Sequence, residues 1–258
     1  MQLKGKVAAI TGGTRGIGRG IAEAFIAQGA KVVVGGRSED KGQRALEEMN
    51  VGDSAQFTAM DAHNQADVEA FVDATIERFG QVDILVNNAG GSSGFAPIAT
   101  MSDEAWSSSL DIMLNATFWA SRRALPGMLK RGWGRIINIT SVDSKLIDKA
   151  NIGHYIVNKG AINTLTKVLA FENGPSGVTA NAILPGAVET DLMNVTGREL
   201  AESMNMSYED YLNSYAELAS IKRLTTVEEI AAVAVLLASE HGGGINGSEL
   251  DVHGGTVL

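Results

Sequence analysis

Short runs of apolar residues, rich in valine and isoleucine, recur along the chain, and stretches with helical spacing separate them. Most of these runs are continuously apolar, which is typical of strands that are buried on both faces of a sheet. Strands that alternate with helices predict an α/β fold, a doubly wound parallel sheet of about seven strands with helices on both faces. The predicted strands span residues 6–10, 31–35, 55–59, 83–87, 135–140, 178–184 and 248–252.

Apolar residues at helical spacing fill most of the segments between the strands. The spacing predicts helices after the first and third strands, and two longer helices over residues 102–130 and 155–172. A further helix is expected over residues 227–238, because Thr226 and Glu229 have the spacing of a capping box.

Residues 191–221 interrupt this alternation as an insertion. The rest of residues 1–258 contains no internal repeat, low-complexity tract or linker, so we expect one domain that carries the insertion. The insertion carries apolar and aromatic residues that include Leu192, Met193, Met204, Met206, Tyr208, Tyr211, Leu212 and Tyr215.

Composition and charge narrow the class of protein. A chain of 258 residues with 45% hydrophobic composition can bury a substantial core. Its formal net charge of -9 argues against nucleic acid and anionic membranes as partners, since both require a basic face. The sequence shows neither a signal-peptide core nor a transmembrane stretch, so we expect a cytoplasmic protein. It has no cysteine, and its four histidines lack metal-ligand spacing, so no metal site is expected.

A glycine-rich loop follows the first predicted strand. Gly12, Gly16 and Gly18 stand where the strand must turn into a helix, and such a turn brings backbone amides to a pyrophosphate at the positive end of the helix. The spacing differs from the common G-x-G-x-x-G fingerprint, but strand, loop and helix occur in the required order. We therefore expect a bound dinucleotide, with a ligand-free glycine loop as the alternative.

The end of the second predicted strand indicates which dinucleotide is bound. An NAD site places an acidic residue there, on the ribose 2'-hydroxyl, whereas this chain has Gly36 followed by Arg37. Arg37 and Arg15 of the glycine loop offer positive charge to a 2'-phosphate, although two solvated arginines are the alternative. The cofactor is therefore expected to be NADP(H), and Glu39 and Asp40 keep NAD(H) as the second choice.

Further motifs occur in order, and over essentially its whole length the chain resembles the short-chain dehydrogenase/reductase family, including its 3-oxoacyl-carrier-protein reductases. The motifs are T-G-x3-G-x-G at 11–18, N-N-A-G at 87–90, Asn115, Ser141, Y-x3-K at Tyr155 and Lys159, N-A-I-L-P-G-A-V-E-T at 181–190, and Gly254-Gly255. The resemblance implies a Rossmann-type sheet and an oxidoreductase that moves a hydride between NADP(H) and a carbonyl or secondary alcohol substrate.

The resemblance also implies four catalytic residues, Asn115, Ser141, Tyr155 and Lys159. Tyr155 and Lys159 lie one helical turn apart, so the ammonium group would lower the pKa of the phenol from its usual value of about 10. Tyr155 would exchange a proton with the substrate oxygen, which Ser141 would position. Lys159 would also bind the nicotinamide ribose, and Asn115 would hold a water for a proton relay. A helix asparagine with a local hydrogen bond is the alternative for Asn115.

The same resemblance implies an extended set of cofactor contacts. Asp61 would contact the adenine, with an ordinary turn residue as the alternative, and the segment after the sixth strand would hold the nicotinamide. The expected cofactor-binding residues are Gly12, Thr14, Arg15, Gly16, Ile17, Gly18, Arg37, Asp61, Asn88, Ala89, Gly90, Tyr155, Lys159, Pro185, Gly186, Val188 and Thr190.

Substrate contacts are expected from Ser141, Asp143 and Tyr155. Asp143 and His154 depart from the family pattern. A carboxylate at position 143 would disfavour acidic substrates and accept hydrogen bonds from hydroxyls or an amine, with a solvated loop aspartate as the alternative. Family members that oxidise hydroxybutyrate bind its carboxylate with basic residues in this stretch, so Asp143 and Ile152 argue against that activity.

The 191–221 insertion resembles the family's variable substrate loop, and its methionines and tyrosines either line an adaptable lid or form its packing core. The resemblance further implies assembly into a homotetramer through the helices over 102–130 and 155–172. Two alternative functions stay open: an NAD-dependent catabolic alcohol dehydrogenase, and a non-catalytic regulator that binds the cofactor.

Overall fold

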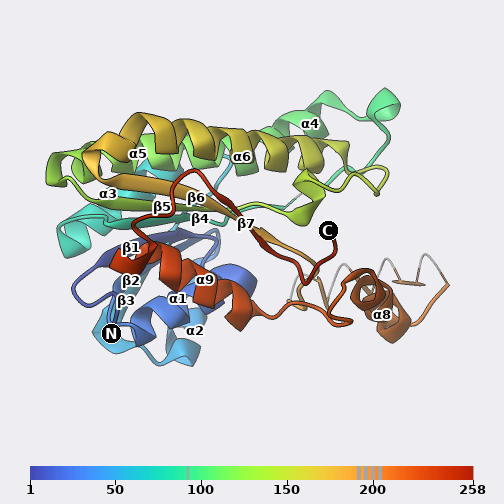
Figure 1. The fold of residues 1–258 in the computed structure, drawn as a ribbon, viewed down its shortest axis with the longest axis horizontal. Helices are drawn as coiled ribbons and strands as arrows, with labels where there is room; N and C mark the ends of the chain where they lie inside the picture. The colour runs from blue at the N-terminus through green and yellow to red at the C-terminus, as the bar shows by residue number, and fades with distance from the viewer. Residues whose placement is uncertain (92, 191–192, 195–196, 199–200, 203–204, 258) are drawn as a thin grey trace.

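A computed structural model describes the chain except for residues 92, 191–192, 195–196, 199–200, 203–204 and 258. Seven parallel strands form one sheet in the order β3-β2-β1-β4-β5-β6-β7 (Figure 1). This confirms the predicted α/β fold, and every strand bound lies within one residue of its predicted position. The strands are β1 (Val7–Thr11), β2 (Lys31–Gly36), β3 (Ala55–Ala59), β4 (Ile84–Asn87), β5 (Gly134–Ile139), β6 (Val178–Pro185) and β7 (Glu249–Val252).

Helices cover both faces of the sheet (Figure 1). One apolar cluster joins Phe25 and Ile230 to the side chains on one face of β1 and β2, and a second joins Phe71 to the opposite face. The first face carries α1 (Gly16–Ala27), α2 (Glu39–Met49) and α9 (Val227–Ala238), and the second carries α3 (Gln65–Phe79), α5 (Ala116–Arg131) and α6 (Gly153–Asn173).

The polar helix α2 was not predicted. Its sequence is mostly charged and contains Gly42, and it buries only Gly42 and Ala45. The helix begins at Ser38, whose side chain accepts a hydrogen bond from the backbone N–H of Lys41. The pattern of apolar residues therefore carries little signal for this helix. By contrast, α9 has the predicted bounds, and both hydrogen bonds of the Thr226–Glu229 capping box are present.

The predicted long helix over residues 102–130 is present, but it contains a π-helical turn that was not predicted. The segment forms α4 (Asp103–Leu110), a π-helical turn η3 (Asp111–Asn115) and then α5. A π-turn inserts an extra residue into a helix and is common at functional sites. Hydrophobic spacing does not detect this change, because the flanking helices keep one apolar face.

The remaining elements are short, apart from one helix in the insertion. Leu192 and Met204 of the insertion lie outside the described residues, while α8 (Tyr208–Leu218) follows them. No helix among the described residues is long and apolar enough to cross a membrane. The 3-10 turns are η1 (Gly52–Ser54), η2 (Ile98–Thr100), η4 (Val142–Ser144), η5 (Gly174–Ser176) and η6 (Glu240–Gly242).

The strand order reverses beside β1. From β1 the chain moves through β2 to β3 on one side, and then starts again at β4 on the other side. Connections that diverge in this way leave a crevice at the carboxyl ends of the two central strands, where α/β sheets bind ligands. The glycine loop after β1 and the N-N-A-G segment after β4 therefore meet at this crevice.

Candidate active site

The glycine loop is held in shape by the segment after β4. The Thr11 hydroxyl oxygen accepts hydrogen bonds from the backbone N–H groups of Asn88 and Ala89, both at 3.0 Å. In return, the Asn88 side-chain amide donates to the carbonyl oxygens of Thr11 at 3.1 Å and Gly12 at 2.9 Å. These bonds join the two connections that border the crevice, so Asn88 supports the loop as well as lining the space beside it.

The three glycines of the loop have different structural roles. Gly12 and Gly16 adopt φ values of +66° and +53°, a left-handed conformation that favours glycine. A Cβ atom on Gly18 would lie 2.4 Å from both the Gly12 carbonyl oxygen and the Asn88 Nδ2. Gly18 does not line the crevice, unlike Gly12 and Gly16. Its expected contact with the cofactor stays a prediction, and its place in the structure is in the packing beneath the loop.

The crevice forms a cavity at the amino end of α1. Arg15 caps this helix without a side-chain cap hydrogen bond, and the first turn contains no acidic residue, so the positive helix end faces the cavity. Arg15 and Arg37 are both exposed at its rim. The cavity is lined by Gly12, Thr14, Arg15, Gly16, Ile17, Gly36, Arg37, Met60, Asp61, Ala62, Asn88, Ala89, Gly90, Ile112 and Thr190.

Asp61 lies on this cavity as part of an ordered cluster. Its Oδ1 atom accepts a hydrogen bond from the His63 backbone N–H at 3.1 Å and lies 2.9 Å from His63 Nδ1. The other ring nitrogen of His63 lies 3.1 Å from the Ser108 hydroxyl on α4. The hydrogen bonds from His63, with a smaller contribution from the charge of Arg37, hold the pKa of Asp61 below its usual value. Asp61 is therefore a fixed, ionised acceptor at the cavity wall.

A second cavity continues from the first, and both are lined by Ile17, Asn88, Gly90 and Thr190. The structure brings the predicted residues Ser141, Tyr155 and Lys159 together around this second cavity. Its other lining residues are Gly91, Ile139, Thr140, Val142, Asp143, Lys149, Pro185, Gly186, Ala187, Val188, Met193 and Tyr215. A ligand that fills both spaces would run from the glycine loop to the tyrosine.

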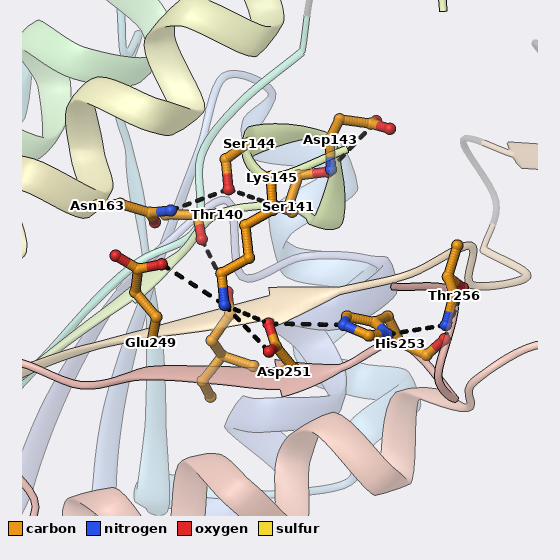
Figure 2. A network of polar contacts seen from close by, with 11 residues as sticks. Thr140, Ser141, Asp143, Ser144, Lys145, Asn163, Glu249, Asp251, His253 and Thr256 are labelled. Atoms are coloured by element: carbon orange, nitrogen blue, oxygen red, sulfur yellow. Dashed lines mark hydrogen bonds and ion pairs between the residues drawn. The ribbon is translucent and has the colours of Figure 1, made fainter. Parts of the chain in front are cut away.

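Ser141 is fixed by hydrogen bonds on its carboxyl-terminal side. The Ser144 hydroxyl donates to the Ser141 carbonyl oxygen at 2.6 Å and accepts from the Asn163 side-chain amide at 2.9 Å, which ties η4 to α6 (Figure 2). The next residue, Lys145, reaches β7 and lies 2.9 Å from Asp251 Oδ1 (Figure 2). The turn that carries Ser141 is therefore anchored to both a helix and an edge strand.

Tyr155 and Lys159 lie one turn apart on α6, as predicted, but burial opposes the expected lowering of the pKa of Tyr155. Burial raises the pKa of Tyr155 to about 12, and the nearby Asp143 carboxylate also raises it, while the Ser141 hydroxyl lowers it. Burial lowers the pKa of Lys159 to about 8. The Lys159 ammonium lies 5.6 Å from the Tyr155 ring centre and donates to the Ile139 carbonyl oxygen at 2.8 Å. Lys159 alone therefore does not favour the phenolate.

Asp143 belongs to a charged cluster at the second cavity. Its backbone N–H donates to the Ser141 hydroxyl at 3.1 Å, and that hydroxyl donates to Asp143 Oδ2 at 3.3 Å. Its other carboxylate oxygen lies 2.5 Å from Lys149 Nζ, which lies 5.5 Å from the Tyr215 ring centre. Sequence reasoning missed Lys149, although it is the basic residue closest to the middle of the 141–155 stretch. A cation therefore does reach this cavity, but Asp143 offsets its charge.

Asn115 and His154 do not line either cavity. Asn115 lies at the end of the π-helical turn, and its amide donates to Asp111 Oδ1 at 2.7 Å, a local bond four residues back. Its part in a proton relay stays a prediction. His154 is fully buried, and its Nε2 atom lies 3.1 Å from the Ser93 carbonyl oxygen. His154 therefore packs against the segment after β4 and does not face the substrate cavity.

The described part of the insertion has features of both roles considered for it. Met193 and Tyr215 line the second cavity, as a substrate lid would. Tyr211 is buried, and its hydroxyl lies 3.2 Å from the Tyr215 hydroxyl, as in a packing core. Among the described residues there is no cluster of three or more side chains suited to bind a metal ion.

Comparisons with known proteins agree with this geometry. Residues 12–257 match a family profile described as enoyl-(acyl carrier protein) reductase. The chain is 36% identical to a 3-oxoacyl-acyl-carrier-protein reductase of Vibrio cholerae, over 100% of both chains. It is also 36% identical to a D-beta-hydroxybutyrate dehydrogenase of Cupriavidus necator, over 99% of each chain.

A solved structure shows the same arrangement. A crystal structure of an actinorhodin polyketide ketoreductase with NADPH superimposes with a TM-score of 0.91 at 32% identity, and covers 99% of this chain and 98% of that chain. Fold, motifs and full-length similarity agree. The chain therefore belongs to the short-chain dehydrogenase/reductase family, whose enzymes are nicotinamide-dependent oxidoreductases of alcohol and carbonyl groups.

Proposed function

We propose that this oxidoreductase uses NADP(H) to interconvert a carbonyl group and a secondary alcohol, with Tyr155 as the general acid and base. The observation that carries the proposal is the continuity of the two cavities, which share four lining residues. A dinucleotide whose phosphates lie at the start of α1 would reach the second cavity, where Ser141 and Tyr155 meet.

The residues present fit such a cofactor. The left-handed Gly12 and Gly16 leave the backbone at the cavity without side-chain obstruction, and the uncapped start of α1 suits a pyrophosphate. Asp61 suits the adenine amine, because the hydrogen bonds from His63 occupy one carboxylate oxygen and leave the other free. When bound, the nicotinamide supplies or accepts the hydride.

The chain's own groups would handle the proton. In reduction, Tyr155 donates its hydroxyl proton to the carbonyl oxygen, and in oxidation it takes the proton back. Ser141 donates a hydrogen bond to the same oxygen, and Asp143 lies within reach of a neighbouring group of the substrate. Lys159 binds the nicotinamide ribose, and Asn115 serves the proton relay once its amide leaves Asp111. Because burial raises the pKa of Tyr155 to about 12, the tyrosine is protonated at neutral pH, the form that carbonyl reduction requires.

Three observations support NADP(H) over NAD(H). Gly36 supplies no carboxylate, and a Cβ atom there would already lie 3.3 Å from the Thr14 side chain. Arg15 and Arg37 stand at the cavity rim, where they would bracket a 2'-phosphate. Glu39 and Asp40, which kept NAD(H) open, lie in the first turn of α2 and do not line the cavity. The structurally similar ketoreductase was crystallised with NADPH.

Broader features of the protein are proposed on the same basis. Residues 1–258 form one domain with a substrate loop at about 191–221, to which the two lining residues Met193 and Tyr215 belong. The outer faces of α5 and α6 expose apolar side chains, including Phe118 and Phe171, which supports assembly into a homotetramer. Light scattering tests the assembly, and cell fractionation tests the cytoplasmic location that the sequence predicts.

Two alternatives make different predictions. An NAD-dependent catabolic alcohol dehydrogenase would bind NADH at least as tightly as NADPH. A regulator without turnover would bind the cofactor but oxidise no NADPH with any ketone, and the joint presence of Ser141, Tyr155 and Lys159 at one cavity favours an enzyme instead.

The experiment that tests the proposal titrates NADPH and NADH separately into wild type and Arg37→Ala, with nicotinamide fluorescence as the readout. We expect tighter binding of NADPH in the wild type, and loss of this preference in Arg37→Ala by roughly tenfold, since a charge-assisted phosphate contact contributes about 1.5 kcal/mol. Arg44→Ala in α2 provides the control. Equal or tighter NADH binding in the wild type would contradict the NADP(H) assignment.

A further inference from the structure

The cluster of Asp143, Lys149 and Ser141 has two contacts that the roles proposed above do not explain, the Asp143–Lys149 ion pair and the Ser141–Asp143 hydrogen bond. Its side chains line the cavity that Tyr155 also lines, and they come from η4 and the loop that follows it. The Asp143 side chain is only 13% exposed and the Lys149 side chain is 32% exposed, so the pair is largely shielded from water. A shielded ion pair beside an acid–base residue influences the charge that this residue can carry.

We propose that Asp143 is a positioning residue for the Ser141–Tyr155 pair, and that Lys149 is the counter-charge that limits its effect. The Ser141 hydroxyl has one proton, and in this structure it donates that proton to Asp143 Oδ2 at 3.3 Å. The carboxylate therefore sets the resting direction of the Ser141 hydroxyl. Because Lys149 lies on the other carboxylate oxygen, at 2.5 Å, it weakens the hold of Asp143 on this proton.

The inference rests on the proposed function, in which the proton of Tyr155 moves to the carbonyl oxygen. In that step the hydride adds to the carbonyl carbon, the O–H bond of Tyr155 breaks, and the alcohol forms beside a tyrosinate. A carboxylate near the tyrosine opposes this negative charge, and it is one of the causes that raise the pKa of Tyr155. Asp143 therefore keeps Tyr155 protonated up to higher pH, so the tyrosinate that oxidation requires forms only at higher pH.

Few titratable side chains surround Tyr155 among the described residues that line its cavity. The titratable side chains on the cavity are Asp143 of η4, Lys149 of the following loop, Lys159 of α6 and Tyr215 of α8. Lys159 is held by the Ile139 carbonyl oxygen, and Lys149 also lies against the Tyr215 ring. Asp143 and Lys149 can thus be substituted without removing a group from α6, which carries Tyr155 and Lys159.

The test compares Asp143→Asn, Lys149→Gln and the double variant by the pH dependence of kcat, with cyclohexanol and NADP⁺ as model substrates. Oxidation requires tyrosinate, so its rate rises as pH passes through the pKa of Tyr155. We expect Asp143→Asn to move this rise to lower pH by roughly one unit, and Lys149→Gln to move it to higher pH. In the Asp143→Asn background, Lys149→Gln should have a clearly smaller effect, since it acts through the carboxylate.

Asp148→Asn is the matched control. Asp148 lies in the same loop, is exposed, and lines a neighbouring cavity with Arg223 instead of the one with Tyr155, so its variant should leave the profile in place. An Asp143→Asn profile that coincides with that of Asp148→Asn overturns the role of Asp143. An equal shift from Lys149→Gln in both backgrounds overturns the role of Lys149 as its counter-charge.

A second readout separates this inference from the proposed function. NMR of ring-labelled tyrosine, with Tyr155→Phe used to assign the signal, follows the titration of Tyr155 in the NADP⁺ complex without any turnover. The same directions of shift are expected in this experiment. If the wild type turns over no alcohol or ketone, the proposed function fails, whereas an unmoved Tyr155 signal in Asp143→Asn contradicts the inference alone.

Discussion

The two cavities that meet at the carboxyl end of the sheet are lined by different kinds of groups. The wall at the glycine loop is mostly backbone and small side chains, fixed by the hydrogen bonds that join Thr11 to Asn88. The wall at Tyr155 consists of side chains from η4, α6 and α8, with the buried Lys159 and the Asp143–Lys149 pair. The first cavity recognises a ligand by shape and helix polarity, and the second by the placement of charge and protons.

Because of this difference, we expect substitutions of charged groups in the second cavity to lower turnover without lowering the free energy of unfolding. Buried ionisable groups destabilise a fold and are kept for chemistry, whereas a tight backbone turn serves folding and binding together. Each variant below tests one side of this division.

The largest effect is expected for Lys159→Met. Because burial lowers the pKa of Lys159 from 10.5 to about 8, the folded protein holds an unfavourable ammonium below that pH, and this penalty fades as pH rises from about 8 to 10.5. The variant should therefore unfold with a free energy about 2 kcal/mol higher than the wild type at pH 7, and the gain should shrink by pH 9.5. Turnover should fall at least about a hundredfold.

Denaturant unfolding at both pH values measures this effect, with Lys167→Met as the control. Lys167 lies on the same helix with a side chain that is 59% exposed, so its removal should bring no comparable gain. If Lys159→Met is less stable than the wild type at pH 7, the contacts of the buried ammonium outweigh the cost of its burial, and the prediction is wrong.

A smaller effect on stability and binding is expected for Gly18→Ala in the glycine loop. The added Cβ would meet the Gly12 carbonyl oxygen and the Asn88 amide at 2.4 Å, so the loop must shift. We expect a loss of about 1–3 kcal/mol in the free energy of unfolding, together with at least roughly tenfold weaker NADPH binding. In Gly244→Ala, where the new Cβ has no neighbour within 4 Å, both quantities should stay near wild type. If Gly18→Ala binds NADPH as tightly as the wild type, the shape of the loop does not determine cofactor binding.

The smallest effect is expected for His63→Gln at the far end of the first cavity. The variant removes the ring nitrogen that lies 2.9 Å from Asp61 Oδ1, while the backbone hydrogen bond from residue 63 can remain. Loss of this one side-chain hydrogen bond should weaken NADPH binding by about two- to fivefold and leave kcat unchanged, because the backbone hydrogen bond still holds Asp61. Isothermal titration and steady-state kinetics measure the two quantities, and a change in kcat alone would contradict a role at the adenine end.

The sequence predicts the first cavity better than the second for a physical reason. Gly12, Gly16 and the residues after β4 act through local backbone geometry, which leaves a short motif at a fixed place between strand and helix. The second cavity depends on side chains that meet only after folding. Lys149 and Tyr215 stand 66 positions apart in the printed sequence, and no motif records that they lie side by side.

The incorrect predictions have related causes. The π-helical turn at Asn115 and the polar helix α2 leave little trace in hydrophobic spacing, because one keeps the apolar face and the other buries almost nothing. The pKa of Tyr155 was expected to fall because of nearby positive charge, whereas in the protein without cofactor burial raises it to about 12. Desolvation depends on everything packed around a group, so it cannot be read from the spacing of two residues.

The most direct test of the account compares wild type with Tyr155→Phe in two measurements on the same preparation, NADPH affinity by fluorescence and NADPH oxidation with cyclohexanone. The variant keeps the ring in α6 and removes only the hydroxyl. The account predicts that turnover falls by about 10²–10⁴-fold while NADPH affinity stays within about twofold of the wild type. Turnover close to that of the wild type would contradict the assignment of Tyr155 as the proton donor.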